Sequence, residues 1–176
     1  MEARTGPTIA RGRSKQDYPT PWSFIRACEK KFGYEIMFDL AASLGNAKAA
    51  DFFTVADDSL KQDWAKLHAG KKRGWLWLNP PFDNITPWAK KCAEESARGA
   101  WIMFLTPASV GANWFRDHVH GRSVVHALNG RIQFVGADDP YPKDCILSVF
   151  RPLPYASAGF AVWRWQDELM SDPMFS

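Results

Sequence analysis

The sequence has few cysteines, and the three that it has stand far apart. Cys28, Cys92 and Cys145 are odd in number, and neither a Cys-x-x-Cys pair nor a Cys/His cluster with the spacing of metal ligands occurs. This pattern argues against a zinc site, and we expect no metal ion. Reduced thiols in the core of a cytoplasmic protein are the simplest account of the three cysteines.

Long apolar runs are also lacking. No run approaches the roughly 18 apolar residues that a membrane span requires. The N-terminal segment lacks the apolar core of a signal peptide. We therefore expect a protein that acts in the cytoplasm and has no membrane partner.

A strong charge of one sign is the third absence. The chain carries 22 lysines and arginines against 19 acidic residues, so the formal net charge is only +3. Composition alone therefore does not identify a nucleic-acid binder. Two local basic clusters are more suggestive. Such clusters bind phosphates in many proteins, but the alternative interpretation is ordinary solvated surface charge. The two clusters are Arg4, Arg11, Arg13 and Lys15 near the N-terminus, and Lys71-Lys72-Arg73 in mid-chain.

What the chain has in plenty is apolar and aromatic residues. It is 46% hydrophobic over 176 residues and contains nine tryptophans, which is ample for one packed core. Residues 1–16 are polar, basic and punctuated by glycine and proline, so they predict a flexible arm. Residues 17–176 are expected to form a single domain.

Over the first two-thirds of this domain, short apolar runs alternate with amphipathic stretches. The alternation predicts an α/β fold with a mostly parallel sheet covered on both faces. The last third has strand-like runs without long helices between them, which predicts antiparallel strands that complete the sheet. The expected strands are 36–38, 52–55, 75–78, 101–105, 124–128, 132–135, 145–150 and 160–165, and the expected helices are 21–32, 85–96 and 114–119.

The first of these helices has recognisable boundary signals. Thr20 is a typical capping residue, and Pro21 suits the first helical position. Gly33 is a natural stop.

The expected strand order also predicts where ligands bind. In open sheets of this kind, ligands bind beyond the carboxyl ends of the strands. That rule brings residues 39–43, 79–82 and 106–109 to one edge of the sheet.

The segment Asn79-Pro80-Pro81-Phe82 is the most specific chemical signal in the chain. Two prolines fix two φ angles and remove two backbone donors, so the loop is rigid and presents acceptors. These acceptors are the side-chain oxygen of Asn79 and a proline carbonyl, and Phe82 adds an aromatic face beside them. Such a loop can also be a plain end to a buried strand, although two prolines in that position are unusual.

This arrangement suits the methylation of an amino group on a planar ring. The exocyclic amine of adenine is a poor nucleophile because its lone pair is delocalised into the ring. Two acceptors that hold its N–H groups localise the lone pair and take up positive charge in the transition state. Phe82 is expected to stack on the base, which must be flipped out of a duplex or arrive unpaired.

Six segments together resemble the small phage-type DNA N6-adenine methyltransferases, the phage Dam-like family. The match runs from Tyr18 to Phe150, about three-quarters of the chain, and Asn79 to Phe82 resemble motif IV of amino-methyltransferases. The matching segments are Thr20-Pro21-Trp22, Phe38-Asp39-Leu40-Ala41-Ala42-Ser43, Leu60 with Asp63-Trp64, Trp77-Leu78-Asn79-Pro80-Pro81-Phe82, Leu105-Thr106-Pro107-Ala108 and Gly130-Arg131-Ile132-Gln133-Phe134.

The resemblance implies a Rossmann-like fold and S-adenosylmethionine as the methyl donor. It implies that the Asp39 carboxylate holds the ammonium group or a ribose hydroxyl, and that small side chains after it allow close approach of the cofactor. Asp63 is expected to accept from the amine of the cofactor's adenine, with Trp64 over the ring. The full set of expected cofactor contacts is Tyr18, Thr20, Pro21, Asp39, Ala41, Ala42, Asp63 and Trp64.

DNA is the expected partner of a monomer or weak dimer, in the host cytoplasm if the protein is phage-encoded. Arg131 is expected to contact a phosphate or a base edge, or else to form a structural ion pair. Lys71, Lys72 and Arg73 are further expected DNA contacts. Specificity is expected from loops near 66–74 and 109–122 and from the basic arm.

Two alternatives remain open on the residues alone. The same chemistry serves cytosine N4, RNA adenine or a protein glutamine, although asparagine at position 79 leans towards adenine or glutamine. A catalytically inactive DNA-binding or protein-interaction module on the same fold is the second alternative, and the intact Asn-Pro-Pro-Phe segment argues against it.

Overall fold

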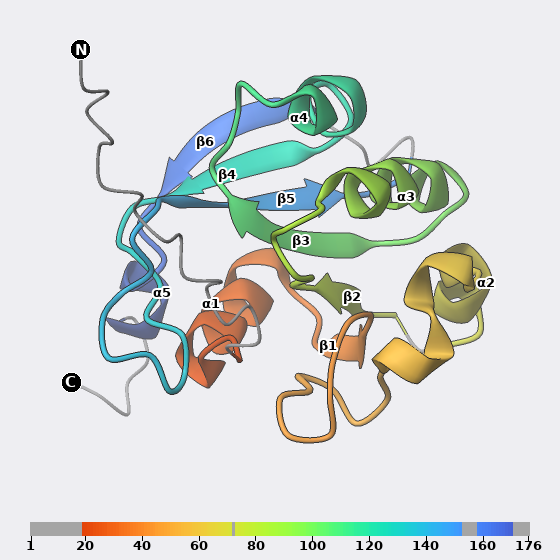
Figure 1. Cartoon of the computed structure of the whole chain (residues 1–176), viewed down its shortest axis with the longest axis horizontal. Helices are drawn as coiled ribbons and strands as arrows, with labels where there is room; N and C mark the ends of the chain where they lie inside the picture. The colour runs from red at the N-terminus through yellow and green to blue at the C-terminus, as the bar shows by residue number, and fades with distance from the viewer. Residues whose placement is uncertain (1–18, 72, 153–157, 171–176) are drawn as a thin grey trace, which may run out of the picture.

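A computed structural model describes residues 19–71, 73–152 and 158–170. Within them, six strands form one mixed sheet in the order β1-β2-β3-β5-β4-β6 (Figure 1). Strand β5 runs antiparallel to both of its neighbours, whereas every other neighbouring pair is parallel. The strands are β1 Ile36–Asp39, β2 Trp75–Leu78, β3 Ile102–Pro107, β4 Val124–Leu128, β5 Cys145–Phe150 and β6 Gly159–Trp163.

This sheet confirms the predicted α/β class, and its pairing is mixed, with three parallel and two antiparallel neighbouring pairs. The prediction for the C-terminal strands is only half right. Strand β5 is antiparallel as expected, but β6 pairs with β4 in parallel. Strand β6 therefore lies at the edge of the sheet beyond β4, and β5 and β6 do not pair as a hairpin.

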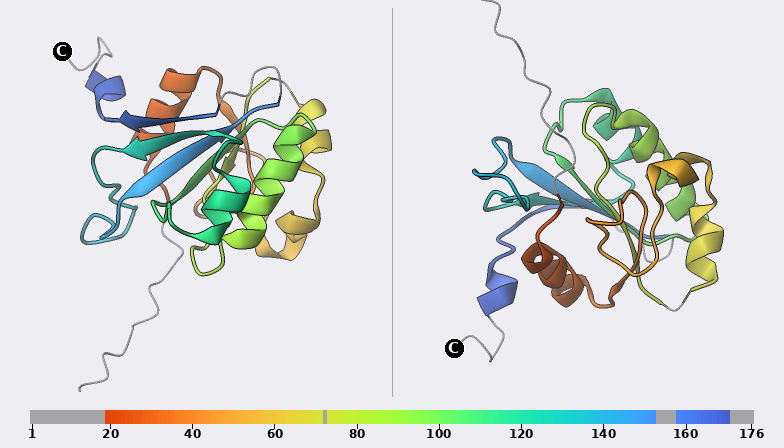
Figure 2. Two further views of the ribbon diagram at one scale, coloured as in Figure 1. Left: turned by 90° about the horizontal axis from the view of Figure 1, so that it is seen from above. Right: turned by 60° about the horizontal axis from the view of Figure 1, so that its bottom comes forward.

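Helices cover both faces of the sheet. Helices α1 (Trp22–Phe32) and α5 (Asp167–Met170) lie on one face, and α2 (Trp64–Ala69), α3 (Thr86–Ala97) and α4 (Asn113–His118) lie on the other (Figure 2). The strands serve both layers because their side chains alternate. In β2, the two tryptophans pack on the α1 side and the two leucines pack on the α3 side.

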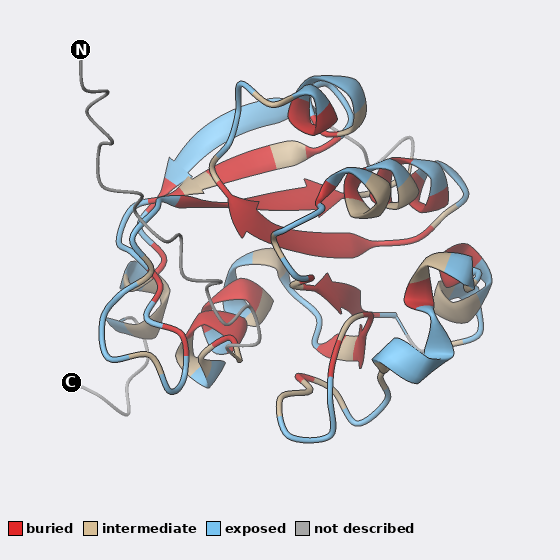
Figure 3. Cartoon of the chain, viewed as in Figure 1, coloured by how far each residue is buried: buried red, intermediate tan, exposed pale blue. Residues whose placement is uncertain are grey.

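The central strands are buried throughout. Every residue of β2, β3 and β5 is buried, as the red central strands in Figure 3 show. Strands covered on both faces are continuous hydrophobic runs, which is why the sequence revealed them clearly.

Two expected strands do not form. Residues 52–55 make one isolated bridge, between Phe52 and Asp39, and then enter the 3₁₀ turns Val55–Asp57 and Ser59–Lys61. Residues 132–135 lie in the loop between β4 and β5. Ile132 and Phe134 are buried there by packing on the α1 side, without a partner strand.

The start of α1 differs slightly from the prediction. The helix begins at Trp22, with Pro21 in the capping position, and no side chain caps it. Gly33 ends it at a φ of 66°, as expected of a glycine stop. The Thr20 hydroxyl, predicted to cap this helix, instead bonds to the loop after β2. Tyr18, Lys72 and the basic arm lie outside the described residues.

Candidate active site

A cavity of about 280 Å³ opens at the carboxyl ends of β1 and β2. Its position agrees with the rule that ligands bind beyond the carboxyl ends of parallel strands. Its walls come from the segment before α1, the loop after β1, the 3₁₀ turns and the loop after β2. The predicted site residues that line it are Thr20, Asp39, Ala41, Ala42, Asn79 and Pro81.

The Asn79 side chain is held in place by Thr20. Its amide nitrogen donates to the Thr20 hydroxyl oxygen at 3.1 Å, and Thr20 is only 1% exposed. Because the bond engages the amide nitrogen, the amide oxygen is the atom that can accept from a ligand amine. Both residues were predicted to lie near the site, but no local sequence signal predicts a bond across 59 positions.

Pro80, Pro81 and Phe82, in the loop after β2, differ in their surroundings. Pro81 is exposed and lines the cavity, whereas Pro80 is buried. Phe82 is half-buried, and its ring meets the edge of Tyr141 with 5.8 Å between centroids. Tyr141 in turn packs on Phe134. The loop between β4 and β5 is therefore part of the rim of the site.

Asp39 ends β1 and is 3% exposed. One carboxylate oxygen accepts from the backbone N–H of Ala41 at 3.2 Å, and the other accepts from that of Lys48 at 3.0 Å. Burial raises the pKa of Asp39, and the two N–H donors partly oppose that shift. Each oxygen retains a second lone pair, so the carboxylate can still accept from a ligand.

The loop after Asp39 is fixed by backbone bonds to its neighbours. The Leu40 N–H donates to the Trp77 carbonyl, and the Ala42 N–H donates to the Phe53 carbonyl. Phe53 also donates back to the Asp39 carbonyl. The segment predicted as a second strand is thus a tether for this loop, and the small side chains of Ala41 and Ala42 border the cavity.

Asp63 and Trp64 lie outside the cavity, so the structure does not bring them together with the other predicted cofactor contacts. Asp63 caps α2 by accepting from the Lys66 N–H at 2.9 Å and pairs with Arg98 at 2.7 Å. The Arg98 bond, with the Lys66 N–H, lowers the pKa of Asp63. Trp64 is fully buried and donates to the Ser59 carbonyl at 2.9 Å. The contacts of Asp63 and Trp64 are therefore ones that stabilise the fold.

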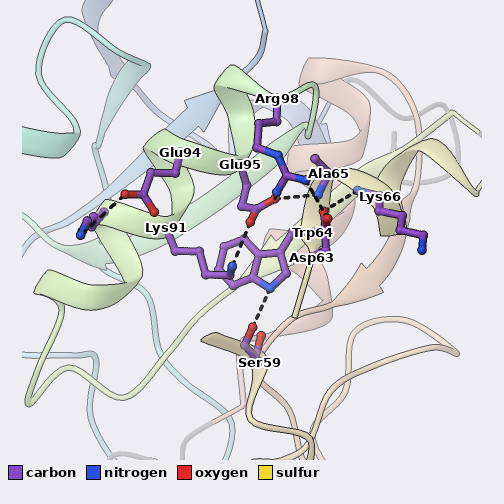
Figure 4. Close-up of polar contacts among 10 residues, drawn as sticks. Ser59, Asp63, Trp64, Ala65, Lys66, Lys91, Glu94, Glu95 and Arg98 are labelled. Carbon is purple, nitrogen blue, oxygen red and sulfur yellow. Dashed lines mark hydrogen bonds and ion pairs between the residues drawn. The ribbon is translucent and has the colours of Figure 1, made fainter. Parts of the chain in front are cut away.

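A network of hydrogen bonds and ion pairs around Glu95 joins α2 to α3 next to Asp63 and Trp64 (Figure 4). Glu95 is 5% exposed and accepts from the Ala65 N–H, from Lys91 and from Arg98. A buried carboxylate is tolerable when it is paired and hydrogen-bonded in this way. The network fixes the turn that carries Ser59 and Leu60, and these two residues line the cavity in place of Asp63 and Trp64.

Several cavity residues were not singled out from the sequence as ligand contacts. Trp88 lies in the predicted helix 85–96 and was not predicted to contact a ligand. It borders the cavity and stacks on Trp64 with ring centroids 6.4 Å apart. A lysine isolated among small residues was the one sequence signal for Lys48. The remaining lining residues that were not predicted as ligand contacts are Pro19, Leu40, Asn46, Thr54, Val55, Asp58, Ser59, Leu60 and Trp77.

The predicted DNA contacts fall in different places. Arg73 lies before β2, at the opposite end of the sheet from Asn79, and its guanidinium covers the rings of Tyr34 and Trp101. Lys71 pairs with Asp51. Arg131 lies in the rim loop and forms an exposed, 3.7 Å ion pair with Asp144. The structure therefore separates Lys71 and Arg73 from the cavity, along with the loop 66–74 that was expected to read sequence.

Two further features of the described residues bear on other partners. Among these residues, none of the helices has the length and apolar character that crossing a bilayer demands. No group of three or more histidine, cysteine or acidic side chains in the same part of the chain is arranged to hold a metal ion. All three cysteines are buried and free, and burial raises the pKa of each thiol.

Comparison with known proteins gives one family. A family model described as DNA N-6-adenine-methyltransferase (Dam) matches residues 9–152. The DNA N-6-adenine-methyltransferase of Haemophilus phage HP1 (strain HP1c1) is 26% identical over 151 aligned positions, which cover 81% of this chain and 83% of that protein. The protein of the same name from Escherichia phage T1 is 30% identical over 157 positions, and the match covers 77% of this chain and 63% of that relative.

Proposed function

Because the chain belongs to the DNA N-6-adenine-methyltransferase (Dam) family, we propose that its cavity holds S-adenosylmethionine and that the loop from Asn79 to Phe82 holds the target adenine. Family membership confirms the resemblance drawn from the sequence, and with it the assignment as an enzyme that methylates adenine N6 in DNA. The donor, the residue roles and the Rossmann-like character of the sheet belong to the proposal.

One observation carries the proposal. The residue predicted to hold the target amine, Asn79, and the residue predicted to hold the cofactor, Asp39, border the same cavity although 40 positions separate them in the sequence. Thr20 connects the two parts of the site, because it borders the cavity and its hydroxyl accepts a hydrogen bond from the Asn79 amide. A methyl donor in this cavity would therefore lie next to an acceptor for the amine.

The cavity residues fit S-adenosylmethionine. The buried carboxylate of Asp39 suits the ammonium group or a ribose hydroxyl, and Ala41 and Ala42 leave room beside it. Leu60 and Trp88 offer an apolar wall for the adenine ring. The cofactor supplies a methyl group activated by a positively charged sulfur.

The chain itself orients and activates the amine. The Asn79 oxygen accepts one N–H of the adenine amine, and the Pro80 carbonyl is proposed to accept the other. Both acceptors stabilise the positive charge that develops on nitrogen as the new C–N bond forms. The Thr20 bond keeps the Asn79 amide in the required orientation, so little reorganisation is needed at the moment of reaction.

Phe82 is proposed to aim the flipped base. Its ring is half-buried against Tyr141, so it is held in place before DNA arrives. A fixed aromatic face costs little entropy when a base stacks on it, and stacking contributes roughly 1–3 kcal/mol per base in single-strand binding. The extra proton of the methylated amine can then leave to solvent, so no strong general base is needed.

The experiment is transfer of label from tritiated S-adenosylmethionine to unmethylated DNA, followed by nucleoside analysis. We expect label in N6-methyladenine, and little in RNA of the same sequence. Label in N4-methylcytosine would overturn the choice of acceptor. A protein that transfers no label and binds no cofactor would instead be an inactive module on this fold.

A further inference from the structure

Lys48 is a buried cation beside the cavity. The residue is 7% exposed and lines the same wall as Asp39. Among the ion pairs of the described residues, none involves Lys48. Its ammonium lies 4.8 Å from the centroid of the Trp22 ring, which is 49% exposed. An aromatic face compensates only partly for the loss of water around a charge.

The other lysines show how unusual this environment is. A carboxylate lies within ion-pair distance of Lys31, Lys61, Lys71, Lys90 and Lys91. The other described lysines are exposed, namely Lys30, Lys66 and Lys143. Lysine is almost never buried unless its ammonium is paired, because desolvating the charge costs free energy. Burial lowers the pKa of Lys48, and the nearby charge of Asp39 opposes that shift. The site therefore favours an additional anion from outside the chain.

The loop after β1 is shaped to bring Lys48 back to Asp39. The Ser43 N–H donates to the Asn46 side-chain oxygen at 2.6 Å, and the Asn46 N–H donates to the Ser43 carbonyl. This turn reverses the chain so that the Lys48 N–H reaches the Asp39 carboxylate at 3.0 Å. An acidic and a basic side chain are thus fixed together on one wall of the cavity.

We propose that Lys48 binds the carboxylate of the methionine part of S-adenosylmethionine, while Asp39 accepts from the ammonium on the same carbon atom. The inference rests on the proposed function. A ligand end that carries one positive and one negative charge is complementary to a wall that carries one of each. With this assignment, Lys48 and Asp39 mark the amino-acid end of the cavity, and Leu60 and Trp88 are left for the adenine end.

The test compares two ligands and two variants by calorimetry. S-adenosylhomocysteine carries the amino-acid end, whereas 5′-methylthioadenosine has the same nucleoside and thioether without it. Lys48→Met keeps the apolar stem and removes the charge. Lys90→Met is the matched control, because Lys90 is an exposed lysine whose ion pair with Glu94 lies on the surface of α3.

We expect Lys48→Met to weaken S-adenosylhomocysteine binding about 10- to 100-fold, the size of a lost charge-assisted hydrogen bond. Binding of 5′-methylthioadenosine should change by less than about twofold, and Lys90→Met should change neither. Lys48→Arg should recover part of the lost affinity, because it restores the positive charge.

Other outcomes would overturn the inference in distinct ways. Equal weakening of both ligands would mean that Lys48 shapes the cavity and does not bind the carboxylate. Unchanged S-adenosylhomocysteine affinity with weaker DNA binding would assign Lys48 to a phosphate. If the unmodified protein bound neither ligand, the proposed cofactor itself would fail, whereas a failure confined to Lys48 would leave it standing.

Discussion

At the amino ends of the parallel strands, two arginines lie on aromatic rings away from the cavity, whereas at the carboxyl ends Lys48 lies on Trp22 and also borders the cavity. Arg73 covers Tyr34 and Trp101, and Arg151 lies 4.5 Å from the centroid of Trp75. At the other end, Asp39, Lys48 and Asn79 surround a space that a ligand can fill. Both ends are rich in charge and aromatic residues, so composition does not distinguish them.

The two ends differ in whether their charged residues border the cavity. At the amino end, each guanidinium has partners within the chain, since Arg151 also donates to the Phe32 carbonyl. The buried Arg151 Nε has no hydrogen-bond partner there among the described residues, but neither arginine lines the cavity. At the carboxyl end, the buried residues Asp39 and Lys48 line the cavity, which agrees with the binding rule for open α/β sheets. The comparison predicts that substitutions at the two ends have different kinds of effect.

The largest effect should come from Asn79 at the carboxyl end. Asn79→Ala removes the acceptor proposed to hold the adenine amine in the transition state. Removing one such group typically costs about 10²- to 10³-fold in turnover. Methyl transfer from tritiated cofactor should fall by that amount, while calorimetry with S-adenosylhomocysteine should show nearly unchanged affinity. Loss of both together would assign Asn79 to the cofactor and not to the target base.

The next effect concerns Asp39 and pH. Because burial raises its pKa, Asp39 takes up a proton at a higher pH than the ordinary value of 3.8. For the protein without cofactor, this favours folding in acid and costs stability as pH rises through the folded pKa. Binding of the cofactor's ammonium requires the ionised carboxylate, so affinity should fall as pH drops through that same pKa.

Calorimetry at several pH values measures this dependence with S-adenosylhomocysteine. Asp39→Asn should weaken binding about 10- to 100-fold at neutral pH and flatten the acid limb. An acid limb that persists in Asp39→Asn would assign the titration to another group.

A smaller effect is expected from Thr20. Thr20→Val has nearly the same shape but cannot accept from the Asn79 amide, so that side chain loses the bond that orients it. A neutral hydrogen bond contributes about 0.5–1.5 kcal/mol net, which corresponds to roughly a three- to tenfold loss of turnover. Thr20→Ser should restore the rate. A rate for Thr20→Val equal to that of the unmodified protein would show that Pro80 and Phe82 suffice to position the base.

The carboxyl-end rim was predictable from sequence because its signals are local. A buried strand followed by two prolines, or by an aspartate and small residues, announces a strand end whatever the tertiary contacts. The contacts of Asp63 at the start of α2 were not predictable in the same way. Asp63 resembles a ligand contact in sequence, and only the approach of Arg98 and Lys66 shows that its carboxylate is already satisfied.

Lys48 and the 132–135 segment show the same limit. Whether Lys48 is a solvated surface charge depends on the turn that returns it to Asp39. The loop that carries this turn is held by backbone bonds to Phe53 and Trp77. Residues 132–135 have the alternation of a strand, but Val135 donates to the Pro19 carbonyl and the Ile132 carbonyl accepts from Tyr141, so their backbone groups are used outside the sheet. Alternation of apolar and polar residues indicates that one side of a segment is buried, but it does not specify a partner strand.

The smallest effect offers the sharpest test of the two ends, because it compares one arginine from each. Arg131 lies on the carboxyl-end rim, and its exposed 3.7 Å pair with Asp144 is weak enough to be exchanged for a phosphate. Arg131→Ala should weaken DNA binding several-fold and lower the slope of log affinity against log salt by about 1.

Arg73→Ala should leave that slope unchanged, because its guanidinium is occupied by Tyr34 and Trp101 at the far end of the sheet. Its loss should appear instead as a melting temperature lower by a few degrees, since each 1 kcal/mol shifts a chain of this size by about 2–4 °C. Fluorescence anisotropy with labelled DNA at several salt concentrations measures both slopes. If Arg73→Ala lowered the slope and Arg131→Ala did not, DNA would approach the amino end, and the carboxyl-end cavity would not be where the target base binds.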